Sequence, residues 1–239
     1  MNGRFSGRVV LVAGGTGGLG HSVSLALLKE EATVVVTYRH PEELVDLQTS
    51  AGALTSSLVA HQVDVTDEAA AAKLIESILA AQGRFDAMVN TVGAYAGGVP
   101  LWELNTRVFD QMLSLNLRAG YSLSRAAIPP MLRQKRGAIV NVVAKAALDH
   151  AAGASAYAAS KAAALAMMDC LAADVKGTGV RVNSILPSII DTKANRIAIP
   201  KADYSTWPKP EEIARVILFL LSDDAKVVHG AAIPVYGDS

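Results

Sequence analysis

Short apolar runs alternate with amphipathic stretches along this chain. The runs are about six residues long and rich in Val, Ile and Leu, which is typical of strands buried on both faces. Between them apolar residues recur every three or four positions, as Leu19, Val23 and Leu27 do, and this period is that of a helix. The pattern predicts strands at residues 8–13, 33–38, 58–65, 85–90, 138–143, 180–186 and 231–235, and helices at residues 19–30, 106–133, 155–176 and 211–221.

The alternation of strands and helices predicts a parallel sheet with helices on both faces. We therefore expect an α/β fold of the Rossmann type, a doubly wound parallel sheet of about seven strands, in a single domain spanning residues 1–239. Asp67 stands where it can cap the helix after the third strand, and Pro129-Pro130 is expected to interrupt the long helix. Residues 188–210 lack a clear period, which is typical of a substrate loop.

Composition narrows the class of partner. The chain has 22 Lys and Arg residues and 22 Asp and Glu residues, a balance that gives no electrostatic reason to expect nucleic acid or an anionic membrane. No apolar run reaches transmembrane length, and the first residues do not resemble a signal peptide. Cys170 is the single cysteine, which excludes an intrachain disulfide and suits a cytoplasmic protein. We expect its thiol to be buried on an alanine-rich helix.

The sequence GGTGGLG at residues 14–20 follows the first predicted strand and opens the first predicted helix. So tight a turn needs backbone conformations and close approaches that glycine permits. The helix start then presents free N–H groups and the positive end of the helix dipole, which suit the diphosphate of a dinucleotide. The alternative is a turn that is glycine-rich for steric reasons alone, but the strand–turn–helix context favours the dinucleotide.

Tyr157 and Lys161 are four residues apart on a predicted helix, so they lie on the same face. A lysine ammonium beside a phenol favours the phenolate, and we expect it to lower the pKa of Tyr157 from about 10 towards working pH. Tyr157 could then exchange a proton with an atom that gains or loses hydride charge. The alternative is an ordinary surface pair on an amphipathic helix.

The spacing Gly-x-x-x-Gly-x-Gly resembles that of the short-chain dehydrogenase/reductase family, and the likeness runs the length of the chain. Residues 90–93, 183–192 and 230–237 resemble family segments, as does the Tyr-x-x-x-Lys of residues 157–161. The resemblance implies a nicotinamide dinucleotide as cofactor and assigns catalysis to Tyr157, Lys161 and Asn116, with Asn116 holding a water of the proton relay. It implies that the cofactor contacts Gly14, Thr16, Gly18, Leu19, Arg39, Asp64, Val65, Asn90, Gly93, Tyr157, Lys161, Pro187, Ile190 and Thr192. For Asn116 a purely structural bond across a helix kink is the alternative.

One departure from the family pattern concerns catalysis. The family usually places a serine thirteen residues before the tyrosine, and this chain has Ala144 there. Two interpretations compete: a member that binds dinucleotide without turnover, or a subgroup whose substrate needs no serine. The second is favoured because residues 93–98, 144–149 and 186–207 resemble the dihydropteridine reductases of the family. Tyr95 and Trp207 could then stack on a flat substrate ring beside Ala144, although both could be ordinary loop packing.

The end of the second strand bears on the choice of cofactor. An acidic residue there accepts hydrogen bonds from the adenosine ribose, whereas an arginine suits a 2′-phosphate. The chain has Tyr38 followed by Arg39, which favours NADP(H) and leaves NAD(H) as the alternative. Arg39 could also be only a solvated charge.

The sequence therefore indicates an NAD(P)H-dependent oxidoreductase that acts on a small molecule of the dihydropteridine kind and has no metal site. The alternatives are a general carbonyl reductase that works without the serine and a non-catalytic dinucleotide-binding sensor. The resemblance also implies a homodimer or homotetramer in which residues 106–133 and 155–176 meet their copies.

Overall fold

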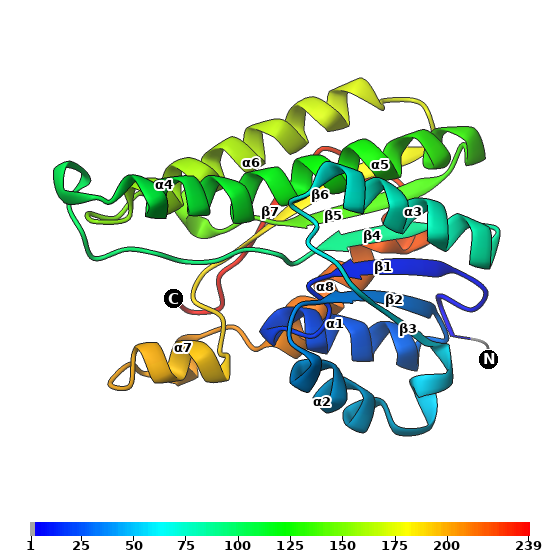
Figure 1. The fold of residues 1–239 in the computed structure, drawn as a ribbon, viewed down its shortest axis with the longest axis horizontal. Helices are drawn as coiled ribbons and strands as arrows, with labels where there is room; N and C mark the ends of the chain where they lie inside the picture. Colours follow the sequence, from blue (N-terminus) through cyan, green and yellow to red (C-terminus); the bar gives the residue numbers. More distant parts are fainter. Residues whose placement is uncertain (1–2) are drawn as a thin grey trace.

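A computed structural model describes residues 3–239 of the chain, and its centre is one parallel sheet (Figure 1). The described strands are β1 (Val9–Ala13), β2 (Thr33–Tyr38), β3 (Leu58–Gln62), β4 (Ala87–Asn90), β5 (Gly137–Val142), β6 (Val180–Pro187) and β7 (Ala232–Val235). They form a seven-stranded sheet in the order β3-β2-β1-β4-β5-β6-β7, and every neighbouring pair is parallel. The predicted Rossmann-type fold is confirmed.

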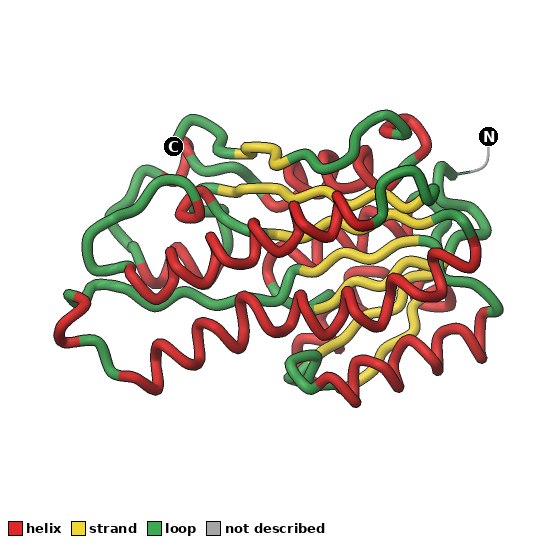
Figure 2. The backbone as a smooth tube through the Cα atoms, turned by 90° about the horizontal axis from the view of Figure 1, so that it is seen from above, coloured by secondary structure: helices red, strands yellow, loops and turns green. Residues whose placement is uncertain are grey.

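Helices cover both faces of this sheet (Figures 1 and 2). They are α1 (Gly18–Lys29), α2 (Pro41–Ala51), α3 (Glu68–Gln82), α4 (Thr106–Leu113), α5 (Ala119–Gln134), α6 (Ser155–Asp174), α7 (Lys193–Ala198) and α8 (Pro210–Leu221). Successive residues of β1 point to opposite faces, so Val10 joins a core with α1, α2 and α8, whereas Leu11 joins a core with α3, α5 and α6. Strands buried in this way explain the continuous apolar runs in the sequence.

Two prolines lie inside α5, although they were expected to interrupt this helix. Pro129 and Pro130 fall within Ala119–Gln134, and the helix ends only beyond them at Lys135, which has a φ of 53°. Leu123, on one side of the prolines, and Met131, at their other end, are both fully buried against the sheet. This packing outweighs the two backbone hydrogen bonds that proline cannot donate.

Two helices and one side chain also differ from expectation, and the first of these, α7, lies within residues 188–210, where the sequence predicted a loop. Helix α2 was not predicted, and Pro41, which marks the end of β2 in the sequence, stands at the first turn of that helix, where proline is favoured. Cys170 is exposed, so the prediction of a buried thiol is wrong. Helix α6 buries the face that carries Leu165 and Met168, and Cys170 lies on its other side. Asp67 caps α3 as predicted, accepting a hydrogen bond from the backbone N–H of Ala70.

Within residues 3–239, none of the helices is long and apolar enough to cross a membrane. The same part of the chain contains no group of three His, Cys, Asp or Glu side chains arranged to hold a metal ion.

Candidate active site

The sheet changes direction between β1 and β4, because β2 and β3 lie on one side of β1 and the later strands on the other. All strands are parallel, so their carboxyl ends share one edge, and ligands of open α/β sheets bind at that edge beside the change of direction. The glycine turn follows β1 there, and residues 91–94 follow β4. The predicted site residues leave the sheet at this edge or lie on helices that pack over it.

Steric contacts explain the composition of the glycine turn. Gly14 has a φ of +72°, and its N–H donates to Oγ1 of Thr37 at 2.9 Å. A Cβ placed on Gly20 would lie 2.1 Å from the carbonyl oxygen of Gly14. Gly17, the N-cap of α1, has no side chain to occupy the helix start, so the first N–H groups of the helix stay open. This cradle fits the diphosphate of a nicotinamide dinucleotide.

The other residues of the turn face different neighbours. Leu19 is 7% exposed and packs in the core, so any contact with a cofactor would come from its backbone. Thr16 donates from Oγ1 to a carboxylate oxygen of Glu43 on α2 at 2.9 Å. Thr192 packs its methyl group against Gly18, where an added Cβ would lie 2.9 Å from it. The loop after β6 therefore reaches the helix start.

Arg39 and Asp64 form an ion pair at the edge of this site. Nη2 of Arg39 lies 3.3 Å from Oδ1 of Asp64, and both side chains are about half exposed. Oδ1 of Asp64 also accepts from the backbone N–H and the hydroxyl of Thr66, and these bonds together with the charge of Arg39 hold the pKa of Asp64 below its usual value. Both residues line a cavity of about 460 Å³ with Leu115 and Ser114. Val65 is buried beside them.

Lys161 and Asn116 converge on the backbone of Gly93. A Cβ on Gly93 would lie 2.8 Å from Oδ1 of Asn116 and 3.0 Å from Nζ of Lys161. Lys161 is 5% exposed, and its Nζ donates to the carbonyl oxygen of Val142 at 3.2 Å. Gly93 is therefore required for space, and the two polar groups meet where β4 and β5 end.

Asn116 lies in a π-helical turn, Ser114–Arg118, between α4 and α5. Its Oδ1 accepts from the N–H of Ala94 at 2.9 Å, and its Nδ2 donates to the carbonyl of Ala94 and to Oγ of Ser160, each at 3.0 Å. Ser160 in turn donates to the carbonyl oxygen of Tyr157 at 2.8 Å. These bonds tie the loop after β4 to α6, so Asn116 has a structural role here, and its place in a proton relay stays a prediction.

Tyr157 differs from expectation in its protonation. Burial and the neighbouring phenol of Tyr95 raise the pKa of Tyr157 to about 12, so the prediction of a lowered value is wrong. The same low-dielectric surroundings lower the pKa of Lys161 to about 8. Removal from water disfavours the charged form of each group and is the largest cause of both shifts. The phenol is consequently a proton donor at neutral pH.

The predicted substrate residues lie in different surroundings. The ring of Tyr95 meets that of Tyr157 edge to face, with centroids 4.9 Å apart, while 69% of the Tyr95 side chain stays exposed. Ala144 is 7% exposed and follows β5. Trp207 is 6% exposed and packs on Tyr204 with centroids 5.0 Å apart, an arrangement that favours loop packing for this side chain.

The remaining predicted cofactor residues hold the edge of the sheet together. Asn90 donates from Nδ2 to Oδ1 of Asn141 at 2.8 Å, which joins the ends of β4 and β5. Pro187 ends β6, and the carbonyl oxygen of Ile190 accepts from Nδ2 of Asn195 at 2.8 Å. Thr192 is the N-cap of α7 and accepts from the N–H of Asn195.

The sequence analysis missed three residues of this region: Thr37, Glu43 and Ser160. Ser160 lies inside the Tyr-x-x-x-Lys segment, but its contact with Asn116 joins residues 44 positions apart. Thr37 follows three buried valines in β2, a pattern that shows its polarity but not its partner Gly14. Glu43 lies in the helix that was not predicted.

Comparison with known proteins identifies the family. The family model described as short chain dehydrogenase matches residues 8–202. The 3-oxoacyl-[acyl-carrier-protein] reductase FabG of Thermotoga maritima is 31% identical over 242 residues, which cover 98% of each chain. The chain belongs to the short-chain dehydrogenase/reductase family, as its glycine turn and Tyr-x-x-x-Lys segment predict.

Solved structures agree with this membership. ElxO with NADP bound matches with a TM-score of 0.90 and 26% identity, covering 96% of this chain and 97% of that one. Carveol dehydrogenase from Mycobacterium avium in complex with NAD matches with a TM-score of 0.89 and 25% identity, covering 98% of both chains. The protein is an NAD(P)-dependent oxidoreductase of this family, and its relatives include binders of either dinucleotide.

Burial of the Lys161 ammonium lowers the free energy of unfolding at neutral pH. The folded state binds fewer protons than the unfolded state between pH 8 and 10.5, because burial lowers the pKa of Lys161 from 10.5 to about 8. Stability from this group therefore rises with pH across that window. Replacing Lys161 by Met should raise the free energy of unfolding at pH 7 by about 2 kcal/mol, after allowing for the lost hydrogen bond to Val142.

Chemical denaturation of the cofactor-free protein between pH 7 and 10 measures this effect. The gain should shrink as the pH rises above 8, and exposed Lys73→Met on α3 is the matched control. A Lys161→Met variant less stable than the wild type at pH 7 would show that the ammonium is well solvated or paired in the folded state.

Proposed function

We propose that this enzyme reduces a flat, conjugated substrate of the dihydropteridine kind, with Tyr157 as the proton donor. The observation that carries the proposal is Ala144. It stands where the family usually supplies a hydroxyl to a substrate carbonyl, beside an otherwise retained set of Tyr157, Lys161 and Asn116. A conjugated, electron-poor ring needs less polarisation of a single carbonyl than a simple ketone does. One proton donor beside it is then sufficient.

Each residue of the proposed site has a task that its surroundings support. When bound, the dinucleotide supplies the hydride. Tyr157 keeps its proton at neutral pH and can deliver it to the ring atom that gains electron density. Tyr95 shields one edge of the phenol and presents an exposed ring on which a flat substrate can stack. Lys161 places a positive charge near the site, which favours the phenolate once the proton has left.

The proton donor is tested by Tyr157→Phe. This change removes the donor and leaves a ring of the same shape, so kcat should fall by about a thousandfold or more while the Kd of the dinucleotide stays within about twofold of the wild type. Stopped-flow turnover and fluorescence titration measure the two quantities. Tyr95→Phe, which keeps the edge-to-face contact, is the matched control and should keep most of kcat. A Tyr157→Phe variant with wild-type kcat would remove Tyr157 from the chemistry.

The substrate class is tested by comparing quinonoid dihydropterin with simple ketones and quinones, for the wild type and for Ala144→Ser. We expect the highest kcat/KM for the dihydropterin in the wild type. The added hydroxyl should raise kcat/KM for ketones by about tenfold and change the dihydropterin value little.

The alternatives give different results in the same assay. The relative from Thermotoga maritima is by name a 3-oxoacyl reductase, and a preference of the wild type for ketones would make this protein a carbonyl reductase that works without the serine. Dinucleotide binding without turnover of any substrate in the panel would favour the sensor.

For the cofactor we propose NADP(H), with Arg39 contacting the 2′-phosphate. A guanidinium is suited to phosphate, and Arg39 is half exposed at the end of β2. Two carboxylates oppose this preference. Asp64 already pairs with Arg39, and Glu43 is bound to Thr16 in the glycine turn, where it can accept hydrogen bonds from ribose hydroxyls and repel a phosphate. NAD(H) therefore remains the alternative.

The dissociation constants of NADPH and NADH, measured for the wild type, Arg39→Ala and Glu43→Gln, test how Arg39 and Glu43 affect the cofactor preference. Arg39→Ala should weaken NADPH by about tenfold to a hundredfold and NADH much less, because only NADPH carries the phosphate. Glu43→Gln should act in the opposite direction and tighten NADPH relative to NADH. A wild type that prefers NADH, together with equal losses of both cofactors in Arg39→Ala, would assign Arg39 to the loop alone.

A further inference from the structure

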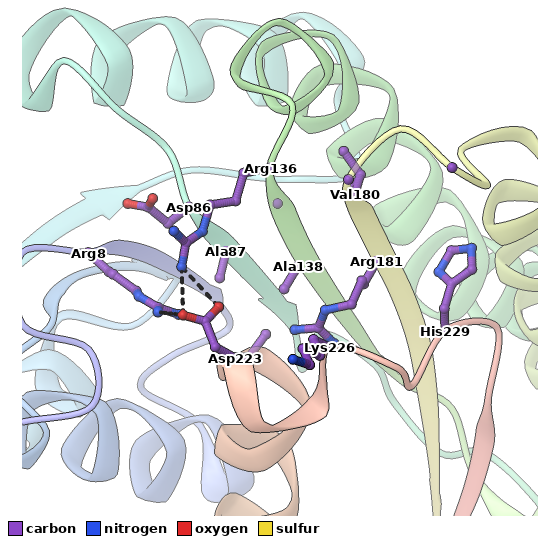
Figure 3. A pocket seen from close by; sticks show the side chains of 14 residues that line it. Arg8, Asp86, Ala87, Arg136, Ala138, Val180, Arg181, Asp223, Lys226 and His229 are labelled. Carbon is purple, nitrogen blue, oxygen red and sulfur yellow. Dashed lines mark hydrogen bonds and ion pairs between the residues drawn. The ribbon is translucent and has the colours of Figure 1, made fainter.

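A second polar cavity lies at the opposite end of the sheet, where the strands begin (Figure 3). It has a volume of about 330 Å³ and is bounded by the starts of β4, β5 and β6 and by the turn Asp223–Ala225 after α8. The charged side chains around it are Arg8, Asp86, Arg136, Arg181, Asp223 and Lys226. The glycine turn and Tyr157 are at the carboxyl edge, so the length of the strands separates the two sites.

The acidic groups of this cavity do not balance its basic groups. Asp86 is occupied, because it accepts two hydrogen bonds from Arg84 at 2.6 and 2.7 Å and one from the N–H of Val9 at 2.8 Å. Asp223 accepts from Arg8 at 2.5 Å and from Arg136 at 2.9 Å. The cavity is therefore lined by four cationic side chains and by two acidic ones, of which Asp86 is already paired with Arg84 and only Asp223 faces the cations of the cavity.

Two of these cations have no acidic partner among residues 3–239. Nη atoms of Arg181 donate to the carbonyl oxygens of Leu220 at 2.6 Å and Ser222 at 3.0 Å, at the end of α8. No carboxylate in that part of the chain lies within 4 Å of the Lys226 ammonium or the Arg181 guanidinium. Burial is the main reason that the pKa of Arg181 is lowered; the charge of Asp223 opposes this shift, and the charges of Arg8 and Arg136 add to it.

The imidazole of His229 is held between two backbone groups. Its Nδ1 accepts from the N–H of Val182 at 3.2 Å, so the proton is on Nε2, which lies 2.9 Å from the carbonyl oxygen of Ala172. Gly177 and Gly179, both with positive φ, form the loop before β6 and line the opening without side chains. Glycines therefore form one side of the cavity, and most of the charged side chains on its other sides are cationic.

We propose that this cavity is a second ligand site, which binds a small oxyanion with at least two negative charges, such as a diphosphate. Guanidinium groups bind phosphate oxygens through paired N–H donors, and Asp223 already holds those of Arg8 and Arg136 side by side (Figure 3). A monovalent anion would compete poorly with Asp223, whereas a polyvalent anion can bridge the arginines and reach Lys226. The proposal does not depend on the substrate of the oxidoreductase.

Isothermal titration calorimetry with inorganic pyrophosphate at low ionic strength tests the site. The enzyme is first saturated with its dinucleotide, so that pyrophosphate cannot bind at the glycine turn. Lys226→Gln and Arg136→Gln should each weaken pyrophosphate about tenfold, because each removes one charged contact. Lys73→Gln, an exposed lysine on α3, is the matched control and should leave the affinity unchanged. Asp223→Asn should tighten binding, since it removes the competing carboxylate.

Lys226 is exposed and unpaired among the described residues, so its variant is expected to fold like the wild type, which circular dichroism can verify. The proposal is overturned if the wild type gives no saturable heat up to about 10 mM pyrophosphate, a limit well above a millimolar Kd. It is also overturned if Lys226→Gln and Arg136→Gln bind pyrophosphate as tightly as the Lys73→Gln control.

Discussion

The buried ammonium group of Lys161 constrains the structure around it at the carboxyl edge of the sheet. Lys161 is followed in the sequence by three alanines, and in the fold it is almost fully buried, with the carbonyl of Val142 as its hydrogen-bond acceptor. Gly93 must lack a side chain to leave it room, and Asn116 must bind Ala94 to hold that loop in place. The π-helical turn places Asn116 beside Ala94, and such turns are frequent at functional sites.

The same low dielectric explains why the free site is prepared for protonation of a substrate. Burial shifts Lys161 and Tyr157 in opposite directions, because it disfavours the cation of one and the anion of the other. The phenol therefore holds its proton firmly, and a nearby positive charge is available when the proton leaves. Burial of these two polar groups lowers the stability of the fold, as is common where function requires buried polar groups.

The parallel sheet separates two positively charged regions that are built in different ways. At its carboxyl edge the open N–H groups of α1 and the buried lysine give a positive environment made largely of backbone and one side chain. At its amino edge the positive environment comes from arginines that border the strands and share Asp223. Because the strands are parallel and rigidly paired, residues just before them gather as regularly as those just after them.

The sequence by itself determined the seven strands, most of the helices, the glycine turn and the placing of Tyr157 and Lys161 on one helix, because each of these depends on patterns within a few residues. Tertiary structure decided the rest. Leu123 and Met131, packed on the sheet, keep α5 helical through Pro129-Pro130. Burial raises the pKa of Tyr157, although Lys161 was expected to lower it. The pairing of Glu43 with Thr16 and of Arg39 with Asp64 joins residues about 25 positions apart, and no local pattern encodes such contacts.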